Sequence, residues 1–203
     1  MTEEEVASLA VFAKKLALYR CYITGAAAFF VFGATFTSII LLSVSIALAF
    51  NIDVFQNPLI GIITVVSASF TSVVLFYLAA PMCRAEEVGG KPVPKIGLRY
   101  ALSFLTPFTV LYSIPISRGY EHIVWYPALG IALLLAYLSI EKEERIGTKL
   151  FLLVSTIILI TTPIVILFDI YKKIGAPLAT SLMLLAYTIT GVYALYRGKK
   201  LFE

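Results

Sequence analysis

The sequence predicts an all-α integral membrane protein with six transmembrane helices, arranged as three tandem helical hairpins with both termini in the cytoplasm. Hydrophobic residues make up 60% of the chain and charged residues only 14%, whereas soluble domains carry about 25% charged residues. The mean hydropathy is correspondingly high, at +0.95. The basic residues gather mostly in alternate gaps between long apolar runs, which is typical of a chain that crosses a membrane repeatedly.

The chain opens with a predicted cytoplasmic amphipathic helix over residues 1–21. Thr2 and Glu5 have the spacing of a capping box at a helix start. The apolar side chains of this segment suit the membrane interface, while its lysines and arginine can reach the lipid headgroups. We therefore expect a lead-in that lies on the membrane surface before the first span.

Six apolar runs follow. A hydrocarbon core of about 30 Å requires about 20 apolar residues per helix, and six runs meet that length. Together they predict a transmembrane domain over residues 22–197, followed by a basic cytoplasmic tail at 198–203. The runs are 22–50, 58–81, 98–117, 122–140, 149–170 and 176–196.

The basic residues orient these spans. Of the 16 Lys and Arg residues, three lie in gaps on one side, at Arg118, Lys172 and Lys173, and the other 13 lie on the opposite side. The positive-inside rule makes the richer side cytoplasmic. This bias accounts for the net charge of +4, so the charge predicts no nucleic-acid partner. The expected partners are membrane lipids, with anionic headgroups at the cytoplasmic face, and a second copy of the chain or other membrane subunits.

The third and fourth runs resemble the fifth and sixth. Thr-Pro pairs at 106–107 and 162–163 precede similar apolar triplets, and Pro127 and Pro177 each precede Leu-Leu-Ala-Tyr at the same spacing. The second run carries a fainter copy. Two helices per unit return the chain to the same side, so the repeats would be parallel. The alternative is a chance match among residues that are common in membrane spans.

The prolines fall into two groups. Pro58, Pro127 and Pro177 lie at the predicted starts of spans, where a missing N–H costs little. Pro107 and Pro163 lie inside spans, where each removes a backbone hydrogen bond and kinks the helix. We expect the threonine before each to help satisfy the freed backbone groups. Two such kinks would frame a cavity or a hinge; the alternative is that they only improve packing.

The ionisable residues exclude several kinds of chemistry. No acidic residue lies near the centre of a predicted span, and proton or ion pumps normally mark their path with such groups. His122 is the only histidine, which excludes a bis-histidine haem site and leaves an intramembrane protease without a base. Cys21 and Cys83 do not complete a four-ligand zinc site with it, and we expect them to stay reduced near the cytoplasmic face. The sequence thus predicts no catalytic residue, metal or cofactor.

The polar residues inside the spans are uncharged. We predict that Thr64, Ser72, Thr106 and Thr162 bind a substrate by lining a cavity for a small neutral solute. The alternative is tight helix packing, in which small residues let backbones approach and each interhelical hydroxyl bond contributes about 0.6 kcal/mol.

Charged residues gather again at the predicted outer face. Arg118, His122 and Asp169 form a predicted charge cluster, and Asp169 has helical spacing to Lys172 and Lys173. This cluster would guard an external mouth and select charge. The alternative is that it anchors helix ends at the headgroups beside an aromatic belt. The belt would consist of Tyr120, Trp125 and Tyr126.

The cytoplasmic end of the fourth run carries Glu141, Glu143 and Glu144. We expect this patch to be a solvated helix end, with docking of a peripheral partner as the alternative. The chain has only three side-chain amides, at Asn51, Gln56 and Asn57, a scarcity typical of thermophilic proteins.

Taken together, these patterns favour a permease or channel-like protein that binds or passes a small neutral solute. The alternative is a non-catalytic accessory or scaffold subunit of a larger membrane complex, consistent with the lack of charge inside the spans. A membrane enzyme that acts on lipid at one face is the least supported hypothesis.

Overall fold

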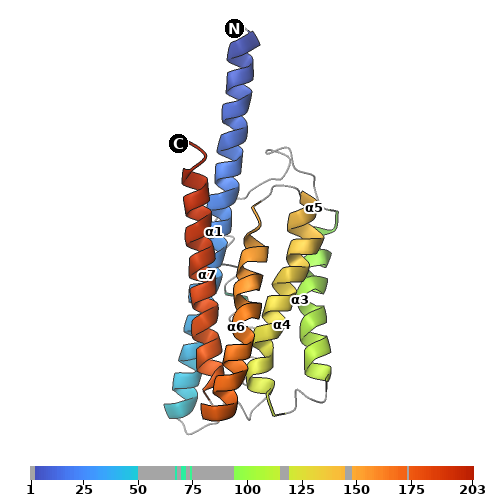
Figure 1. The fold of residues 1–203 in the computed structure, drawn as a ribbon, viewed down its shortest axis with the longest axis vertical. Helices are drawn as coiled ribbons and strands as arrows, with labels where there is room; N and C mark the ends of the chain where they lie inside the picture. Colours follow the sequence, from blue (N-terminus) through green and yellow to red (C-terminus); the bar gives the residue numbers. More distant parts are fainter. Residues whose placement is uncertain are drawn as a thin grey trace.

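The computed structural model describes residues 3–49, 67, 70, 71, 74, 94–114, 119–144, 148–172 and 174–203. Within these residues the protein is all-helical (Figure 1). The long helices are α1 (Glu3–Ala49), α3 (Ile96–Ser113), α4 (Glu121–Ala136), α6 (Leu150–Lys172) and α7 (Gly175–Lys199).

Four stretches of the described chain are long and apolar enough to cross a membrane. They are Glu4–Ser43, His122–Glu141, Leu150–Lys172 and Gly175–Lys199. These helices indicate a membrane protein, as the sequence predicts. The predicted second span, 58–81, lies outside the described residues apart from four positions, so six spans in three hairpins remain a prediction.

Helix α1 is uninterrupted over 47 residues, which is about 70 Å at 1.5 Å per residue. No proline lies within it, and its first glycine is Gly25, so nothing breaks the helix where the predicted lead-in of residues 1–21 meets the first span. In Figure 1 the N-terminal part of α1 continues past the end of α7. The lead-in and the first span are therefore one helix, and its placement on the membrane surface stays a prediction.

Helices α1 and α7 pack against each other through glycines. Gly33 of α1 faces Tyr187 of α7, where an added Cβ would lie 3.0 Å from the Tyr187 Cβ. Gly191 of α7 faces Phe30 of α1, where an added Cβ would lie 2.8 Å from a ring carbon. The rings occupy the space that a Cβ would fill, which is how small residues let membrane helices approach closely.

Neighbouring helices in the described bundle run antiparallel. Ser103 on α3 meets Ser139 beyond the end of α4, and Tyr126 on α4 meets Thr161 on α6. The helices follow one another in space in the order α3, α4, α6, α7 and α1 (Figure 1). Because α4 contacts α6 as extensively as it contacts α3, these contacts do not single out separate hairpins.

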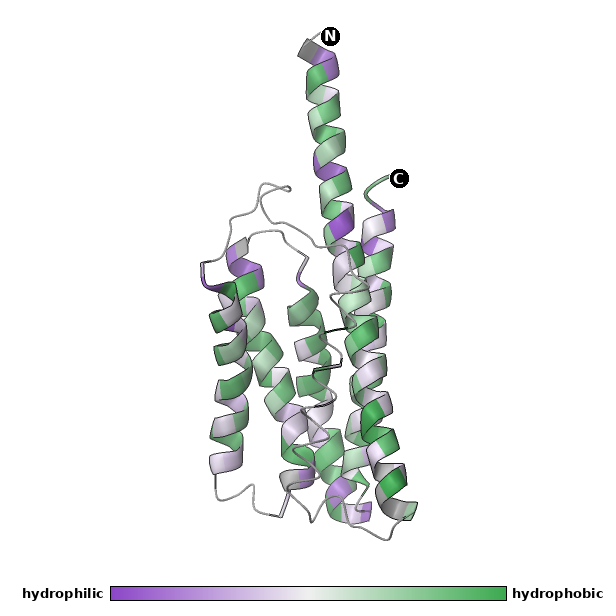
Figure 2. Ribbon diagram, turned by 180° about the vertical axis from the view of Figure 1, so that it is seen from behind, coloured by the Kyte–Doolittle hydropathy of each residue, from purple (hydrophilic) through white to green (hydrophobic). Residues whose placement is uncertain are grey.

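The core lies where α4, α6 and α7 meet. Tyr126, Val154, Ile158 and Met183 are almost completely buried there. Hydrophilic residues gather instead at the two ends of the bundle, whereas the projecting part of α1 alternates hydrophobic and hydrophilic residues (Figure 2). This distribution is what a bilayer requires, with apolar side chains at mid-depth and polar groups in the interfaces.

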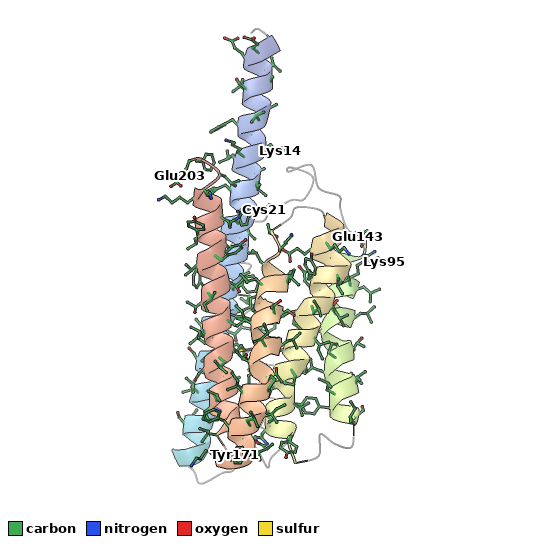
Figure 3. All side chains as sticks on the ribbon, viewed as in Figure 1. Lys14, Cys21, Lys95, Glu143, Tyr171 and Glu203 are labelled. Atoms are coloured by element: carbon green, nitrogen blue, oxygen red, sulfur yellow. The ribbon has the colours of Figure 1, made fainter. Side chains whose placement is uncertain are left out.

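The two ends of the bundle differ. Figure 3 places Lys14, Lys95, Glu143 and Glu203 toward the end that carries both termini, and Tyr171 at the opposite end. The termini therefore lie toward the same end of the bundle (Figure 1). That this end faces the cytoplasm stays a prediction from the basic residues.

The prediction that the cysteines are reduced is wrong for Cys21. It lies on α1, is only 6% exposed and is disulfide-bonded, whereas the sequence analysis expects reduced cysteines. Cys83, the other cysteine of the sequence, lies outside the described residues.

Candidate functional site

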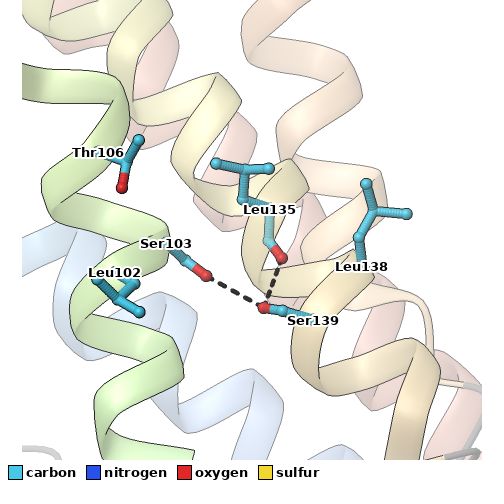
Figure 4. A pocket seen from close by; sticks show the side chains of 6 residues that line it. All are labelled: Leu102, Ser103, Thr106, Leu135, Leu138 and Ser139. Atoms are coloured by element: carbon cyan, nitrogen blue, oxygen red, sulfur yellow. Dashed lines mark hydrogen bonds between the residues drawn. The ribbon is translucent and has the colours of Figure 1, made fainter. Parts of the chain in front are cut away.

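A groove of about 340 Å³ lies between α3 and α4 (Figure 4). Its lining mixes hydroxyl groups with leucines and contains no charged side chain, which suits an uncharged ligand with one or two hydrogen-bonding groups. Thr106, predicted from the sequence as a substrate-binding residue, is one of the lining residues. The lining consists of Leu102, Ser103, Thr106, Leu135, Leu138 and Ser139.

A π-helical turn, η3 (Tyr137–Glu141), follows α4 and shapes the base of this groove. The Ser139 hydroxyl donates to the Leu135 carbonyl at 2.7 Å and lies 3.1 Å from the Ser103 hydroxyl. The Ser139 hydroxyl has one proton and donates it to the Leu135 carbonyl. In the hydrogen bond between the two serines, Ser103 is therefore the donor and Ser139 the acceptor. Single π turns are frequent at functional sites, and this one places Ser139 opposite α3.

Arg99 lies beyond the lining residues of the groove, toward the end that carries the termini. It lies one helical turn before Ser103 on α3, and its Nη1 donates to the Ser139 carbonyl at 2.8 Å. The same nitrogen pairs with Glu143 on the short helix α5 (Lys142–Glu144). The two side chains are 30% and 45% exposed, so the ion pair contributes at most about 1 kcal/mol and mainly holds α3 against η3.

The other predicted substrate-binding residues do not join Thr106 in this groove. Thr162 lies on α6 and is not part of the lining. Three predicted site residues lie outside the described residues, namely Thr64, Ser72 and Arg118. Among the described residues, the candidate site therefore rests on Thr106 and on two serines that were not singled out as binding residues.

The helix-kink residues lie where the sequence places them. Pro107 lies inside α3 and Pro163 inside α6, and both helices continue beyond them. Pro127 was expected at the start of a span, but α4 already begins at Glu121. Pro127 is thus a third internal proline, because Tyr120 accepts the first backbone hydrogen bonds of α4.

Thr162 does not donate a hydrogen bond to the Leu159 carbonyl, which Pro163 leaves without its helical donor. Pro163 lacks the N–H that would bond to the Leu159 carbonyl. The Thr162 hydroxyl donates instead to the Ile158 carbonyl at 2.9 Å. The expectation that this threonine compensates for the proline is wrong, because a side chain at residue 162 reaches its own i−4 carbonyl most easily.

At the opposite end of the bundle, Asp169 links three helices. Its Oδ1 lies 2.9 Å from the Nε2 of His122 on α4 and accepts the backbone N–H of Gly175, the first residue of α7, at 3.1 Å. The sequence predicts His122 and Asp169 in one cluster, and the structure brings them together. Asp169 is only 6% exposed and pairs with His122 rather than with Lys172. Selection of charge by this cluster stays a prediction.

One of the three residues predicted to form the aromatic belt, Tyr126, lies in the core instead. Tyr126 is fully buried, and its hydroxyl lies 2.6 Å from the Thr161 hydroxyl on α6. Trp125 donates its indole N–H to the His122 carbonyl at 3.0 Å, and Tyr120 is 38% exposed. Tyr126 is a core residue because its hydroxyl finds a partner inside the bundle.

Glu141 is a buried polar residue whose role the sequence pattern does not reveal. Its side chain is buried, at 5% exposed, and its carboxylate accepts the backbone N–H groups of Leu150 at 2.7 Å and Phe151 at 3.0 Å. It also accepts the Thr148 hydroxyl. Glu141 therefore caps the start of α6, so the expectation of a solvated residue is wrong. An acidic residue shortly before a second helix is the only sequence signal, and it is too common to identify a cap.

Within the described segments, no three His, Cys, Asp or Glu side chains gather where they could hold a metal ion. The described polar groups act by hydrogen bonding and ion pairing. Comparison of the chain with protein-family models, with curated proteins and with solved structures finds no match.

Proposed function

We propose that this membrane protein is a permease or channel-like protein that binds a small neutral solute in the groove between α3 and α4. One observation carries the proposal: Ser103, Thr106 and Ser139 place their hydroxyl-bearing side chains in one groove whose lining has no charge. Uncharged hydroxyls among leucines recognise hydroxyl or amide groups of a solute and provide no charge to balance that of an ion.

Pro107 adds to this site. It lies one residue after Thr106 and has no N–H, so the Ser103 carbonyl lacks its usual helical donor. A carbonyl freed in this way is a further hydrogen-bond acceptor on the helix that forms one wall of the groove. The predicted kink thus supports solute binding by exposing backbone polarity inside an otherwise apolar bundle.

Solute flux into proteoliposomes tests the proposal. Vesicles that contain the protein are mixed with water, glycerol, urea or another small neutral solute, and swelling is followed by stopped-flow light scattering. We expect faster entry of at least one solute than into empty vesicles. Thr106→Val should slow this entry about fivefold, because it removes one hydrogen bond worth about 1 kcal/mol. Thr109→Val is the matched control, since Thr109 lies on α3 outside the groove. Swelling identical to that of empty vesicles across the panel would contradict the proposal.

An accessory or scaffold role is the second candidate, favoured by the projecting part of α1. Val6, Leu9, Phe12 and Leu16 of α1 are each 44–55% exposed, and the N-terminal part of α1 continues past the end of α7 in Figure 1. A helix with such a surface suits a protein partner. Chemical cross-linking in native membranes, followed by purification in mild detergent, tests this role: a defined subunit attached through residues 6–16 supports it, and a chain recovered without partners counts against it.

A further inference from the structure

The groove continues into a positively charged rim on α3. Lys95, Arg99, Leu102, Ser103 and Thr106 follow one another at intervals of one helical turn or less, so they share a face of α3. The two basic residues lie at the end that carries the termini, and the leucine and the hydroxyls lie deeper. Along this face of α3, the side chains therefore change from charged at the end near the termini to uncharged farther into the bundle.

The rim formed by Lys95 and Arg99 carries more positive charge than its described carboxylate partner neutralises. Arg99 uses one nitrogen, Nη1, for both the Ser139 carbonyl and Glu143, and its other guanidinium donors bond to no residue in the described part of the chain. Among the described residues, Lys95 has no carboxylate within salt-bridge distance, and Figure 3 places Lys95 and Glu143 toward the same end of the bundle. Two positive charges against one negative charge leave the rim suited to an anion.

The deeper part of the groove is open to the side. Leu102 and Leu138, which line it, are 53% and 48% exposed, and Leu105 on the neighbouring face of α3 is 64% exposed. In a bilayer this side of the bundle would meet acyl chains rather than water. A ligand for the whole surface must therefore combine a negative head with an apolar tail.

We infer that the α3–α4 surface is a binding site for one anionic phospholipid. The phosphate lies at Lys95 and Arg99, and one acyl chain lies along Leu102 and Leu138. Basic pockets between helices on the cytoplasmic side bind lipid headgroups in this manner. The site goes beyond a diffuse attraction of the basic face to anionic lipid, because it combines a headgroup position with a groove. It also goes beyond the proposed solute binding: the acyl chain and a solute would compete for the same groove, and a lipid would bind here whether or not a solute crosses.

Native mass spectrometry of the delipidated full chain in detergent tests the inference. Phosphatidylglycerol and phosphatidylcholine with identical acyl chains are titrated separately, and retained lipid is counted. We expect phosphatidylglycerol to be retained preferentially, in one tight copy. Lys95→Gln with Arg99→Gln should weaken that copy about fivefold for each charge removed. The control, Lys199→Gln with Lys200→Gln, removes two charges from the same end of the bundle and should change retention less than about twofold.

Two further variants separate the rim from the groove and do not depend on losing Arg99. Glu143→Gln removes the competing carboxylate and should tighten phosphatidylglycerol binding. Thr106→Phe fills the groove, keeps both charges and should weaken it. Equal retention of the two lipids, or equal losses in the rim and control variants, would overturn the site in favour of ordinary annular lipid or a diffuse basic collar. Lipid retention tests only the lipid site, and vesicle swelling tests only the proposed permease. Failure of one proposal is therefore distinguishable from failure of the other.

Discussion

Glu141 and Asp169 each lie near the end of one helix and accept backbone N–H groups at the start of another, Glu141 at α6 and Asp169 at α7. A buried carboxylate is costly unless hydrogen bonds replace the lost water. The first N–H groups of a helix are unpaired donors at the positive end of its dipole, so they meet part of that need, and His122 adds a second polar contact at Asp169. This explains how these two carboxylates are accommodated in the described part of the bundle.

Glu141→Gln should destabilise the protein. The amide keeps one acceptor but loses the negative charge at the start of α6 and turns a donor toward other donors. We expect a loss of about 1–3 kcal/mol in unfolding free energy, seen as a lower melting temperature by circular dichroism in detergent. Glu203→Gln, which affects the exposed Lys199–Glu203 pair, should change stability by no more than about 0.5 kcal/mol. Equal effects of the two substitutions would show that Glu141 does not cap α6.

Gly175→Ala should break the Asp169 cluster. A Cβ at residue 175 would lie 2.5 Å from the Asp169 Cβ and 2.7 Å from its Oδ1, so either α7 or the carboxylate must move. We expect a loss of about 1–3 kcal/mol, because the buried carboxylate would lose hydrogen bonds. The matched control is Gly97→Ala on α3, where a Cβ meets nothing within 4 Å and should stabilise the helix by about 0.5–1 kcal/mol. Thermal unfolding of both variants in the same detergent measures the two changes in stability. A Gly175→Ala protein as stable as the parent would contradict the close contact between residue 175 and Asp169.

Among the elements, α1 and α7 show most clearly how residue size controls helix packing. Phe30 and Tyr187 fit over Gly191 and Gly33 of the facing helix, so two aromatic rings lie in the interface without separating the backbones. Small residues were expected to act in helix packing, and here they do. The aromatic partners were not predicted, because sequence spacing alone does not show which turn of α1 faces which turn of α7.

Gly191→Leu should force α1 and α7 apart. Its Cβ alone would come within 2.8 Å of the Phe30 ring, and overpacking of this kind costs about 1–3 kcal/mol. Val192→Leu is the control, because Val192 is 54% exposed on the outer side of α7. Melting temperatures of the two variants in the same detergent measure the effect. Retained stability in Gly191→Leu would mean that the two helices are not in close contact there.

At the scale of the whole molecule, the antiparallel order of the helices determines the topology. The α1 helix ends and α3 begins at opposite ends of the bundle (Figure 1), and the span at 58–81 stays a prediction from the sequence. An even number of crossings would leave both termini on one side. The basic residues then favour the cytoplasm for that side.

Reporter fusions test this topology. Alkaline phosphatase, which is active only outside the cytoplasm, should be inactive when fused after Glu203 and active when inserted after Gly119. Green fluorescent protein, which fluoresces after cytoplasmic folding, should show the opposite pattern. Glu203 follows α7 at the end that carries the termini, whereas Gly119 precedes α4 at the other end. Phosphatase activity at Glu203 would place the C-terminus outside and contradict the predicted orientation.

The sequence by itself determined that this is a helical membrane protein, because runs of about 20 apolar residues with charges between them leave few alternatives in a bilayer. It also indicated Thr106 as a polar residue of interest and placed His122 and Asp169 in one cluster, since both lie at the ends of apolar runs. Only the tertiary structure decided which polar groups meet. The Ser103–Ser139 pair, the Glu141 cap and the burial of Tyr126 all depend on a π turn or on the rotation of one helix against another. A shift of one residue turns a helical side chain by about 100°, and hydropathy, which sums over a whole span, is insensitive to that rotation.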